Sequence, residues 1–242
     1  MSSGSIWARP EPGARKASLT RDQIARAAVE LVDAEGVEAL SMRRIAQSLG
    51  VGTMTLYHYV ANKDELLALI DDAVMSEMVI PADEFPAGWR ERLTAIAVST
   101  RALHRRHPWL LAAVGEPRMQ IGPGGLRHAE QTMSAFDGLG LPSEDVMDIA
   151  TLVDEYTFGY VFHRQGDVGE DVFDDATADF FREHLEGGDY PALALLKREG
   201  ESWEQAWARL SIATRDDARF ERGLGRLLDG VELDLRRRGF LD

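Results

Sequence analysis

Residues 41–63, SMRRIAQSLGVGTMTLYHYVANK, contain the pattern that decides the fold of this chain. Apolar residues recur at helical spacing over residues 42–49, and Ser41 can cap the first turn of that helix. Gly50 follows where the chain must reverse, because glycine accepts positive φ without a steric penalty. A second short helix over residues 53–59 comes directly after it. Two short helices joined by a tight turn predict a helix-turn-helix, a motif that binds DNA.

The outer side of the second helix is expected to contact DNA. A helix of seven residues is unstable alone in water, so Leu56 and Val60 must pack inward against other helices. The opposite side then carries hydroxyl, thioether and imidazole groups, which suit base edges, thymine methyls and phosphates in a major groove. These groups belong to Thr53, Met54, Thr55, Tyr57 and His58. Lys63 starts the following helix, where its ammonium and free backbone N–H groups can reach a phosphate.

A helix before this motif and a helix after it complete a predicted DNA-binding domain over residues 20–66. Thr20 and Gln23 can form a capping box at the start of the first helix. Asn62 can cap the helix after the motif, which covers residues 63–78 and connects the domain to the rest of the chain.

Residues 1–19 are expected to form a flexible basic arm, because Pro and Gly interrupt them and no apolar period is present. The arm carries Arg9, Arg15 and Lys16. These side chains could contact phosphates or the minor groove, and the alternative is a tail without a role.

Further residues stand at helix-turn-helix positions in the same register: Gly36, Ser41, Ile45, Ala46, Leu49, Gly50, Val51, Leu56-Tyr57-His58-Tyr59, Lys63 and Leu66-Leu67. With this set, the run from Thr20 to Leu67 resembles the TetR family of bacterial transcriptional repressors. The resemblance implies base or groove contacts from Arg43, Thr53, Met54, Thr55 and His58. It implies phosphate contacts from Ser41, Tyr57 and Lys63.

Charge is divided unevenly along the chain, whose formal net charge is −14. Residues 1–63 hold eight Lys or Arg and six Asp or Glu, whereas residues 64–242 hold nineteen and thirty-five. An acidic body would repel a duplex at close range, so the small basic domain is expected to protrude from it. Phosphate contacts should make DNA affinity fall steeply with salt.

Several classes of protein are disfavoured. The chain has no Cys, which excludes disulfides and a thiolate nucleophile. It shows neither a signal peptide nor an apolar run long enough to span a membrane, so a cytoplasmic location is expected. No catalytic or nucleotide-binding motif occurs, so no enzyme activity, cofactor or metal is expected. Among adjacent acid pairs, Glu144-Asp145 is interpreted as a helix start, and Asp71-Asp72 and Asp174-Asp175 as solvated faces.

The remaining sequence predicts an all-α fold, with a larger helical ligand-binding and dimerisation domain over residues 67–242. The expected helices are 88–107, 108–114, 126–138, 143–165, 175–185, 190–198, 203–210 and 216–238. The helices over 143–165 and 216–238 are interpreted as a dimerisation pair that forms a four-helix bundle across a two-fold axis. The first is apolar on several sides, and the second has glycines that allow close approach. The alternative is that both complete the core of one subunit.

The second part of the chain resembles the tetracycline-repressor branch of the same family at Trp89, at H-R-R-H-P-W over 104–109 and at Tyr156-Thr157-Phe158-Gly159. At the drug and magnesium contacts of that branch, this chain has Val79, Ile96, Thr100 and Val114. The three apolar side chains cannot coordinate a metal, so tetracycline with Mg²⁺ is not expected as the effector. The resemblance keeps Glu155 and His163 as candidate polar contacts.

An effector site is expected among the helices over 88–107, 126–138 and 143–165. Apolar and aromatic lining with a few polar groups suits a mid-sized, partly hydrophobic molecule. The candidate residues are Thr100, His104, Trp109, Met119, Met133, Phe136, Glu155, Tyr156, Phe158, Tyr160, Phe162 and His163. The alternative for each is an ordinary place in the core. His104 and His107 could bind a metal together, but a solvated helix end is the preferred interpretation.

The pattern and the resemblance together predict a homodimeric transcriptional repressor that binds a pseudo-palindromic operator in double-stranded DNA. Two copies of the helix over 53–59, about one helical turn of DNA apart, would read the two half-sites. A small-molecule effector would release the protein from DNA. The alternatives are an activator or ligand-independent regulator with the same DNA-binding domain, and a helical interaction module that has lost DNA binding.

Overall fold

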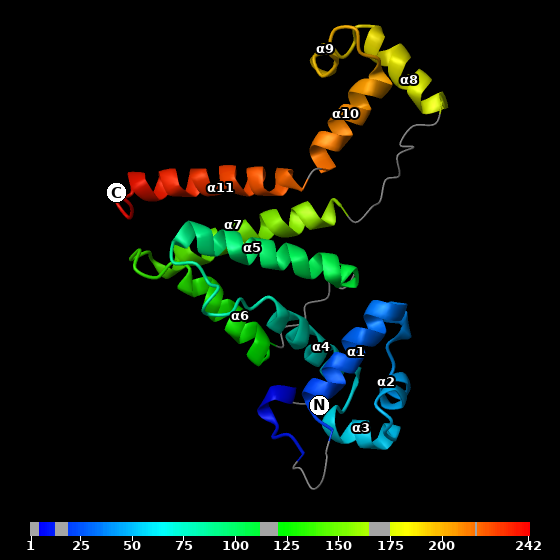
Figure 1. The fold of residues 1–242 in the computed structure, drawn as a ribbon, viewed down its shortest axis with the longest axis vertical. Helices are drawn as coiled ribbons and strands as arrows, with labels where there is room; N and C mark the ends of the chain where they lie inside the picture. Colours follow the sequence, from blue (N-terminus) through cyan, green and yellow to red (C-terminus); the bar gives the residue numbers. More distant parts are fainter. Residues whose placement is uncertain (1–4, 13–18, 112–120, 165–174, 216) are drawn as a thin grey trace. The chain divides into compact units, whose positions relative to one another are not determined.

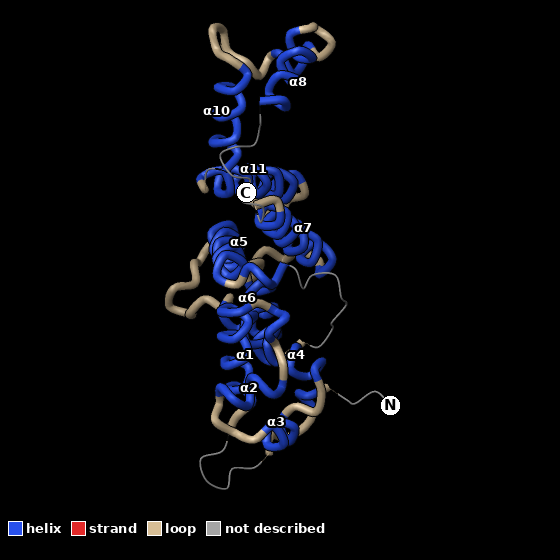
Figure 2. The backbone as a smooth tube through the Cα atoms, turned by 90° about the vertical axis from the view of Figure 1, so that its right-hand side faces the viewer, coloured by secondary structure: helices blue, strands red, loops and turns tan. Residues whose placement is uncertain are grey.

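The computed structural model describes residues 5–12, 19–111, 121–164, 175–215 and 217–242 (Figure 1). These residues form helices and loops, with no strand among them (Figure 2), which confirms the predicted all-α fold. The chain divides into two compact units, one of Met1–Val161 with Asp234–Asp242 and one of Phe162–Leu233. None of the helices described is long and apolar enough to cross a bilayer.

The first unit begins with the predicted DNA-binding helices. They are α1 (Arg21–Glu35), α2 (Met42–Ser48), α3 (Thr53–Tyr59) and α4 (Lys63–Glu77), with a short 3-10 helix, η2 (Val37–Ala39), between α1 and α2. One apolar core joins them, and it includes Ile24, Ile45 and Leu66. Leu56 and Val60 are fully buried in this core. The short α3 is therefore held by its neighbours, as its length requires.

The three side-chain caps that the sequence predicts, at Thr20, Ser41 and Asn62, form in the structure. Thr20 makes both bonds of its capping box. The Ser41 hydroxyl accepts a backbone N–H of the first turn of α2 at 3.4 Å, and the Asn62 side-chain Oδ1 accepts one in α4 at 2.9 Å. Gly50 has a φ of 66° in the turn between α2 and α3, which is the left-handed conformation expected there. Local sequence thus sets both ends of the helix-turn-helix.

Residues 5–12 lie against this core, which differs from the flexible arm expected over residues 1–19. They include a 3-10 helix, η1 (Ile6–Ala8), and Ile6 is fully buried. The Arg21 guanidinium donates to the carbonyl oxygens of Ile6 and Arg9 at 3.0 and 2.9 Å. One buried Ile among Pro, Gly and Ser gives no periodic signal, which is why the sequence did not indicate it. Arg15 and Lys16 lie outside the described residues.

The first unit continues with the helices that surround the candidate effector site. They are α5 (Trp89–Arg106), the 3-10 helix η3 (Pro108–Leu111), α6 (Pro123–Ser134) and α7 (Ser143–Phe162). The helix expected over 108–114 is the shorter η3 in its described part. The start of α6 lies three residues before the expected one, because proline is accepted in the first turn, where no backbone N–H is needed.

A close contact at Gly124 packs α6 against α4. A Cβ on Gly124 would lie only 2.4 Å from the backbone oxygen of Asp72 and 2.1 Å from the Ser76 hydroxyl oxygen. The neighbouring Gly125 N–H donates to Asp72 Oδ1 at 2.9 Å. The absence of side chains therefore lets the two helices approach at backbone distance. This contact holds the second half of α4 against α6, and the DNA-binding core runs along the helix from Leu66 to Val74.

The second unit contains α8 (Asp175–Glu186), α9 (Pro191–Ala194), α10 (Trp203–Arg215) and most of α11 (Ala218–Arg237). Leu185 of α8 and Trp203 and Ala206 of α10 form a small buried cluster. An ion pair between Arg182 and Glu204, at 2.9 Å, joins the same two helices. The helix expected over 190–198 is a single turn, and α10 runs five residues beyond its expected end at 210.

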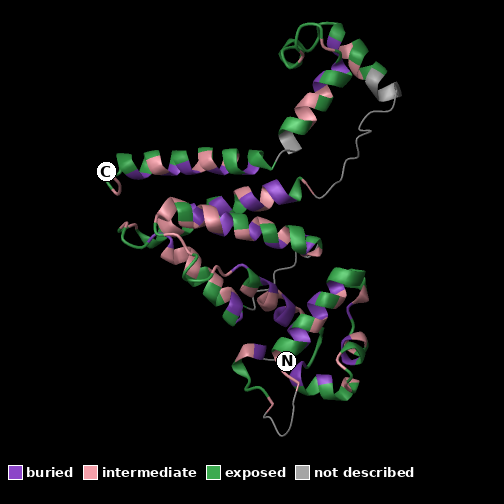
Figure 3. Cartoon of the chain, in the orientation of Figure 1, coloured by how far each residue is buried: buried purple, intermediate pink, exposed green. Residues whose placement is uncertain are grey.

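The two helices predicted for dimerisation keep their apolar stripes. Figure 3 shows α11 buried along one side and exposed along the other. The buried residues are Ile149, Val153, Thr157, Tyr160 and Val161 in α7, and Phe220, Leu224, Leu228, Val231 and Leu235 in α11. In addition, α7 exposes Met147 and Leu152, at 55% and 41%. An apolar side chain on the exposed side of α7 is thus available to a partner.

Candidate DNA-binding surface and effector cavity

The outer side of α3 presents the side chains that the sequence assigned to DNA contact. Thr55, Tyr57 and His58 are exposed, and Thr53 is half-buried. Met54 is 74% exposed, although a thioether gains nothing from water. Two tyrosines that are two residues apart differ sharply, since Tyr57 is 45% exposed and Tyr59 is 7% exposed. One side of α3 therefore belongs to the core and the other is free to meet a partner.

Three more predicted contacts flank α3. Arg43 is exposed on α2, and Lys63 is exposed as the first residue of α4. Ser41 is also exposed, but its hydroxyl already accepts a backbone N–H as the cap of α2. Lys63 stands beside the N–H groups that a helix start leaves free, a place that favours an anion. The eight predicted residues thus all belong to the helix-turn-helix and to the start of α4.

The two adjacent arginines of α2 have different environments. Arg44 forms an ion pair with Glu35 at the end of α1, and this hydrogen bond lowers the pKa of the Glu35 carboxyl. Arg44 therefore connects α1 to α2. Arg43 has no such carboxylate among the described residues, so its guanidinium remains available to DNA.

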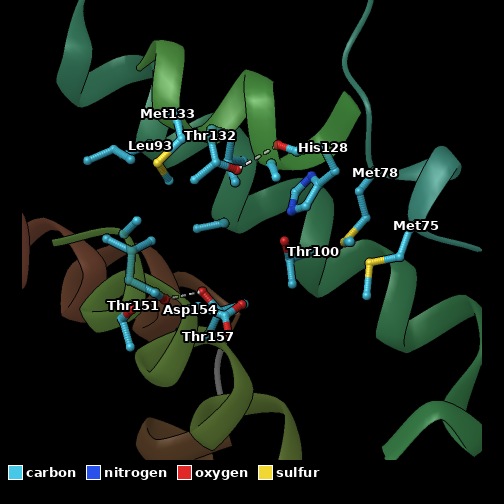
Figure 4. A pocket seen from close by; sticks show the side chains of 15 residues that line it. Met75, Met78, Leu93, Thr100, His128, Thr132, Met133, Thr151, Asp154 and Thr157 are labelled. Carbon is cyan, nitrogen blue, oxygen red and sulfur yellow. Dashed lines mark hydrogen bonds between the residues drawn. The ribbon is translucent and has the colours of Figure 1, made fainter. Parts of the chain in front are cut away.

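Two neighbouring cavities lie among α4, α5, α6 and α7 in the first unit. The larger has a volume of about 660 Å³ and the smaller a volume of about 330 Å³. Both are lined by Met75, Met78, Thr100, His128 and Asp154. Figure 4 shows the smaller one, with His128 and Thr100 close together and Asp154 facing the same space. The larger volume is that of a site for a drug-sized molecule.

The larger cavity combines an apolar surface with acidic groups. Its apolar lining includes Leu103, Leu110 and Phe158. Four carboxylates also line it, which are Asp71 and Asp72 of α4 and Asp154 and Glu155 of α7. The described residues that line either cavity include no Lys or Arg. The described part of the cavity is therefore a site of negative charge.

Burial changes the titration of three groups in these cavities. It raises the pKa of the Asp154 carboxyl, and the negative charge of Glu155 raises that pKa further. Burial lowers the pKa of His104 and of His128, because a charged ring is poorly solvated there. Both rings are therefore neutral at pH 7. Their Nδ1 atoms are buried without a hydrogen-bond partner among the described residues, so each can bond to a ligand.

The structure places half of the ten candidate effector residues at the cavities. Those that line a cavity are Thr100, His104, Met133, Glu155 and Phe158. Four others face elsewhere. Phe136 and Tyr160 are core residues, and Phe162 and His163 are exposed at the end of α7. The fifth, Trp109, packs against the DNA-binding core instead. Of the further positions considered, Ile96 lines the smaller cavity, Val79 and Tyr156 line neither, and Val114 and Met119 lie outside the described residues.

Other cavity residues were not indicated by the sequence pattern. Asp71 and Asp72 were interpreted as a solvated face, but both line the larger cavity. His128 and Asp154 line both cavities and carry the shifted pKa values. Helical spacing shows which residues share a side of a helix, but it does not show which other helix covers that side. The one available signal was that Asp71 and Asp72 interrupt an apolar run over residues 66–75.

His107 connects the DNA-binding core to the end of α4. It is 2% exposed, which corrects the interpretation of a solvated helix end. Its Nδ1 lies 2.7 Å from Asp33 Oδ1 of α1, and its Nε2 lies 3.3 Å from Glu77 Oε2 of α4. Trp109 Nε1 also donates to Asp33, at 2.6 Å. His104 lines the larger cavity instead, so the two histidines do not share a site.

Two family models match this arrangement. The model described as "Bacterial regulatory proteins, tetR family" matches residues 24–70, and the model "Tetracyclin repressor-like, C-terminal domain" matches residues 81–235. The chain belongs to the TetR family. It is therefore a DNA-binding transcriptional regulator with a helix-turn-helix, and its relatives are regulators rather than enzymes.

Individual relatives of the TetR family are similar over nearly the whole chain. The HTH-type transcriptional repressor DrrR1 of Streptomyces coeruleorubidus is 37% identical, covering 96% of this chain and 84% of its own length. The crystal structure of apo ActR from Streptomyces coelicolor has a TM-score of 0.67 at 29% identity, covering 93% of this chain and all of ActR. ActR in complex with actinorhodin has a TM-score of 0.64, at 29% identity, covering 90% and 99%.

Proposed function

We propose that the chain is a cytoplasmic, homodimeric transcriptional repressor that binds a pseudo-palindromic operator and is released by a small-molecule effector. The supporting observation is that one helix belongs to both candidate sites. At its start, α4 places Lys63 beside α3, and in its second half it lines the larger cavity with Asp71, Asp72, Val74 and Met75. A ligand between α4 and α7 would thus act on the helix that positions α3.

The junction at His107 supports the same coupling. His107 lies at the end of α5, and its two ring nitrogens face a carboxylate of α1 and a carboxylate of α4. Because α5 also lines the cavities, a shift of α4 or α5 on ligand binding would change these contacts. A coupling of roughly 1–3 kcal/mol would lower operator affinity by about 5–150-fold.

The relatives support repression and effector binding. DrrR1 is named a transcriptional repressor, and ActR has been crystallised with actinorhodin. We propose the corresponding roles for this chain. The exposed Met147 and Leu152 of α7 support a dimer, since exposed apolar side chains on a long helix suit a second copy of that helix.

Selection from random duplex DNA, followed by fluorescence anisotropy on the selected site, tests DNA recognition. The expected site is a pseudo-palindrome bound by two subunits, with half-sites about one helical turn apart. Changing Leu152→Glu should weaken the dimer and its operator binding together, whereas the same change at Val98, which is exposed on α5, should affect neither. Operator binding by a monomer would contradict the proposed assembly.

Two tyrosines provide a matched control for the DNA surface. Tyr57→Phe removes an exposed hydroxyl from α3, and Tyr59→Phe makes the same chemical change on the buried side. We expect Tyr57→Phe to weaken operator binding and Tyr59→Phe to leave it unchanged. Lys63→Ala should also weaken binding, and the weakening from Tyr57→Phe and Lys63→Ala should be similar for all DNA sequences. Changing Arg43 or Thr53 to Ala should instead relax the sequence preference. Equal effects from all of these variants would contradict the assignment of phosphate and base contacts.

The effect of small molecules on operator affinity distinguishes a ligand-responsive repressor from a ligand-independent regulator. Compounds that raise the melting temperature of the protein should lower its operator affinity. A compound that binds but leaves operator affinity unchanged would indicate a ligand-independent regulator. Transcription from the operator in the presence and absence of the protein distinguishes a repressor from an activator.

A further inference from the structure

The acidic lining of the larger cavity indicates the chemical class of its ligand. We infer that the effector is an amphipathic cation, with an apolar or aromatic body and a protonated amine or delocalised positive charge. This inference rests on the proposed function, because it names the ligand of the same cavity. It follows from the carboxylates of Asp72 on α4 and of Asp154 and Glu155 on α7, an apolar surface beside them, and no Lys or Arg among the described lining residues.

The carboxylates of α7 are available to a ligand. Among the described residues, neither Asp154 nor Glu155 forms an ion pair with a basic side chain. They are adjacent in sequence and both reach the cavity, so their charges repel each other. Asp72 differs, since its Oδ1 accepts the Gly125 N–H at 2.9 Å and is held in place by α6. A cation in the cavity would relieve the repulsion between Asp154 and Glu155. It would also attract the carboxylates of both α7 and α4.

The histidines of the cavity add hydrogen bonding without cancelling the negative charge. Because burial lowers the pKa of both, His104 and His128 are neutral at pH 7. Each has a buried Nδ1 that is free of partners among the described residues. The His104 ring also meets the Phe158 ring edge to face, with centroids 6.1 Å apart. This arrangement suits an aromatic ligand that carries hydroxyl or carbonyl groups as well as a positive charge.

A pair of dyes tests the charge preference directly. Nile blue is cationic and Nile red is neutral at pH 7, and both have the same fused ring system. Binding to the full-length protein is measured by fluorescence anisotropy. Although Nile red is the more hydrophobic dye, we expect Nile blue to bind at least tenfold more tightly. Equal binding, or tighter binding of Nile red, would overturn the inference.

Matched variants on α7 locate the effect in the cavity. The double variant Asp154→Asn with Glu155→Gln removes both charges but keeps the shape of the side chains. The control, Glu144→Gln with Asp148→Asn, makes the same changes at exposed positions of α7 that line neither cavity. The first should weaken Nile blue binding by about tenfold or more and leave Nile red unchanged, and the control should change neither. Equal loss in both double variants would overturn the assignment to the cavity.

The operator assay keeps this inference separate from the proposed function. A protein that binds its operator, and binds Nile red as tightly as Nile blue, would retain the proposed function but not the cationic ligand. A protein that prefers Nile blue through Asp154 and Glu155, but binds no operator, would retain the ligand class and lose the proposed function.

Discussion

The DNA-binding surface and the effector cavity belong to the same compact unit but are built in opposite ways. The surface comes from residues 41–63 and owes its arrangement to local caps and one turn. The cavity draws on four helices over residues 63–162 and depends on how they pack. The surface exposes basic and hydroxyl groups, whereas carboxylates line the cavity. Each region thus has the charge opposite to that of its proposed ligand.

The junction at His107 should show the largest effect, because it joins the two regions. Truncation by His107→Ala removes a buried ring and its contacts to Asp33 and Glu77. Loss of the buried ring leaves a cavity and removes the partner of both carboxylates, so the free energy of unfolding should fall by about 3 kcal/mol. Chemical denaturation measures this. The matched control is His58→Ala, at an exposed position of α3, which should leave stability unchanged.

His107→Ala also tests coupling between the regions. If His107 transmits the effect of the cavity, the variant should still bind Nile blue but lose the change in operator affinity on dye binding. A variant that retains the full change would show that coupling passes through α4 alone.

Gly124→Ala should disturb the cavity while sparing the DNA-binding surface. The added methyl group would collide with the backbone of Asp72, so α6 must move away from α4. Overpacking of this kind costs about 2 kcal/mol of stability. Dye binding should weaken, and operator affinity without ligand should stay near that of the parent protein. The control is Leu126→Ala, which introduces an alanine at a position of α6 that is 60% exposed.

Arg9→Ala should disturb the DNA-binding domain while sparing the cavity. Arg9 pairs with the buried Glu65, which also accepts the Ala61 N–H at 2.8 Å. The Arg9 side chain is 43% exposed, so solvent screens the pair and the expected cost is only about 1 kcal/mol of stability. Thermal unfolding with and without dye measures it. A loss of Nile blue affinity in this variant would contradict the separation of the two regions.

The smallest expected effect is a pH dependence confined to the cavity. Since the pKa of Asp154 is raised, its carboxyl is protonated at low pH and becomes charged as pH rises through that raised pKa. Nile blue affinity should therefore increase by about threefold between pH 4.5 and 7.5, a range over which the dye keeps its charge. Asp154→Asn should flatten this dependence. An affinity that falls as pH rises would contradict the role of Asp154.

The sequence predicted the DNA-binding surface better than the cavity, because the surface depends on local contacts. Caps at Thr20, Ser41 and Asn62 and the turn at Gly50 depend on neighbours within four residues, so the pattern located them correctly. The inward side of α3 also followed, because a short helix needs buried residues. The packing of Ile6 against the core was not predicted, because one buried Ile among Pro, Gly and Ser gives no periodic pattern.

The cavity shows where sequence patterns stop being informative. Asp71 and Asp72 share a side of α4, but only the approach of α6 and α7 encloses them. Trp109 and His107 follow a helix end, where exposure is usual, yet both form hydrogen bonds with Asp33 of α1. Such contacts join residues more than seventy positions apart. A single sequence does not contain the distances that decide them.

Operator binding by Met54→Asp tests the central claim most directly, because the substitution places a negative charge on the exposed side of α3. Met54 is 74% exposed, so the fold should be unaffected. The control is Leu195→Asp, at a position that is 85% exposed in the second unit. We expect Met54→Asp to abolish operator binding measured by anisotropy, with unchanged Nile blue binding, and Leu195→Asp to bind operator normally. Operator affinity equal to that of the parent protein in Met54→Asp would show that α3 does not contact DNA.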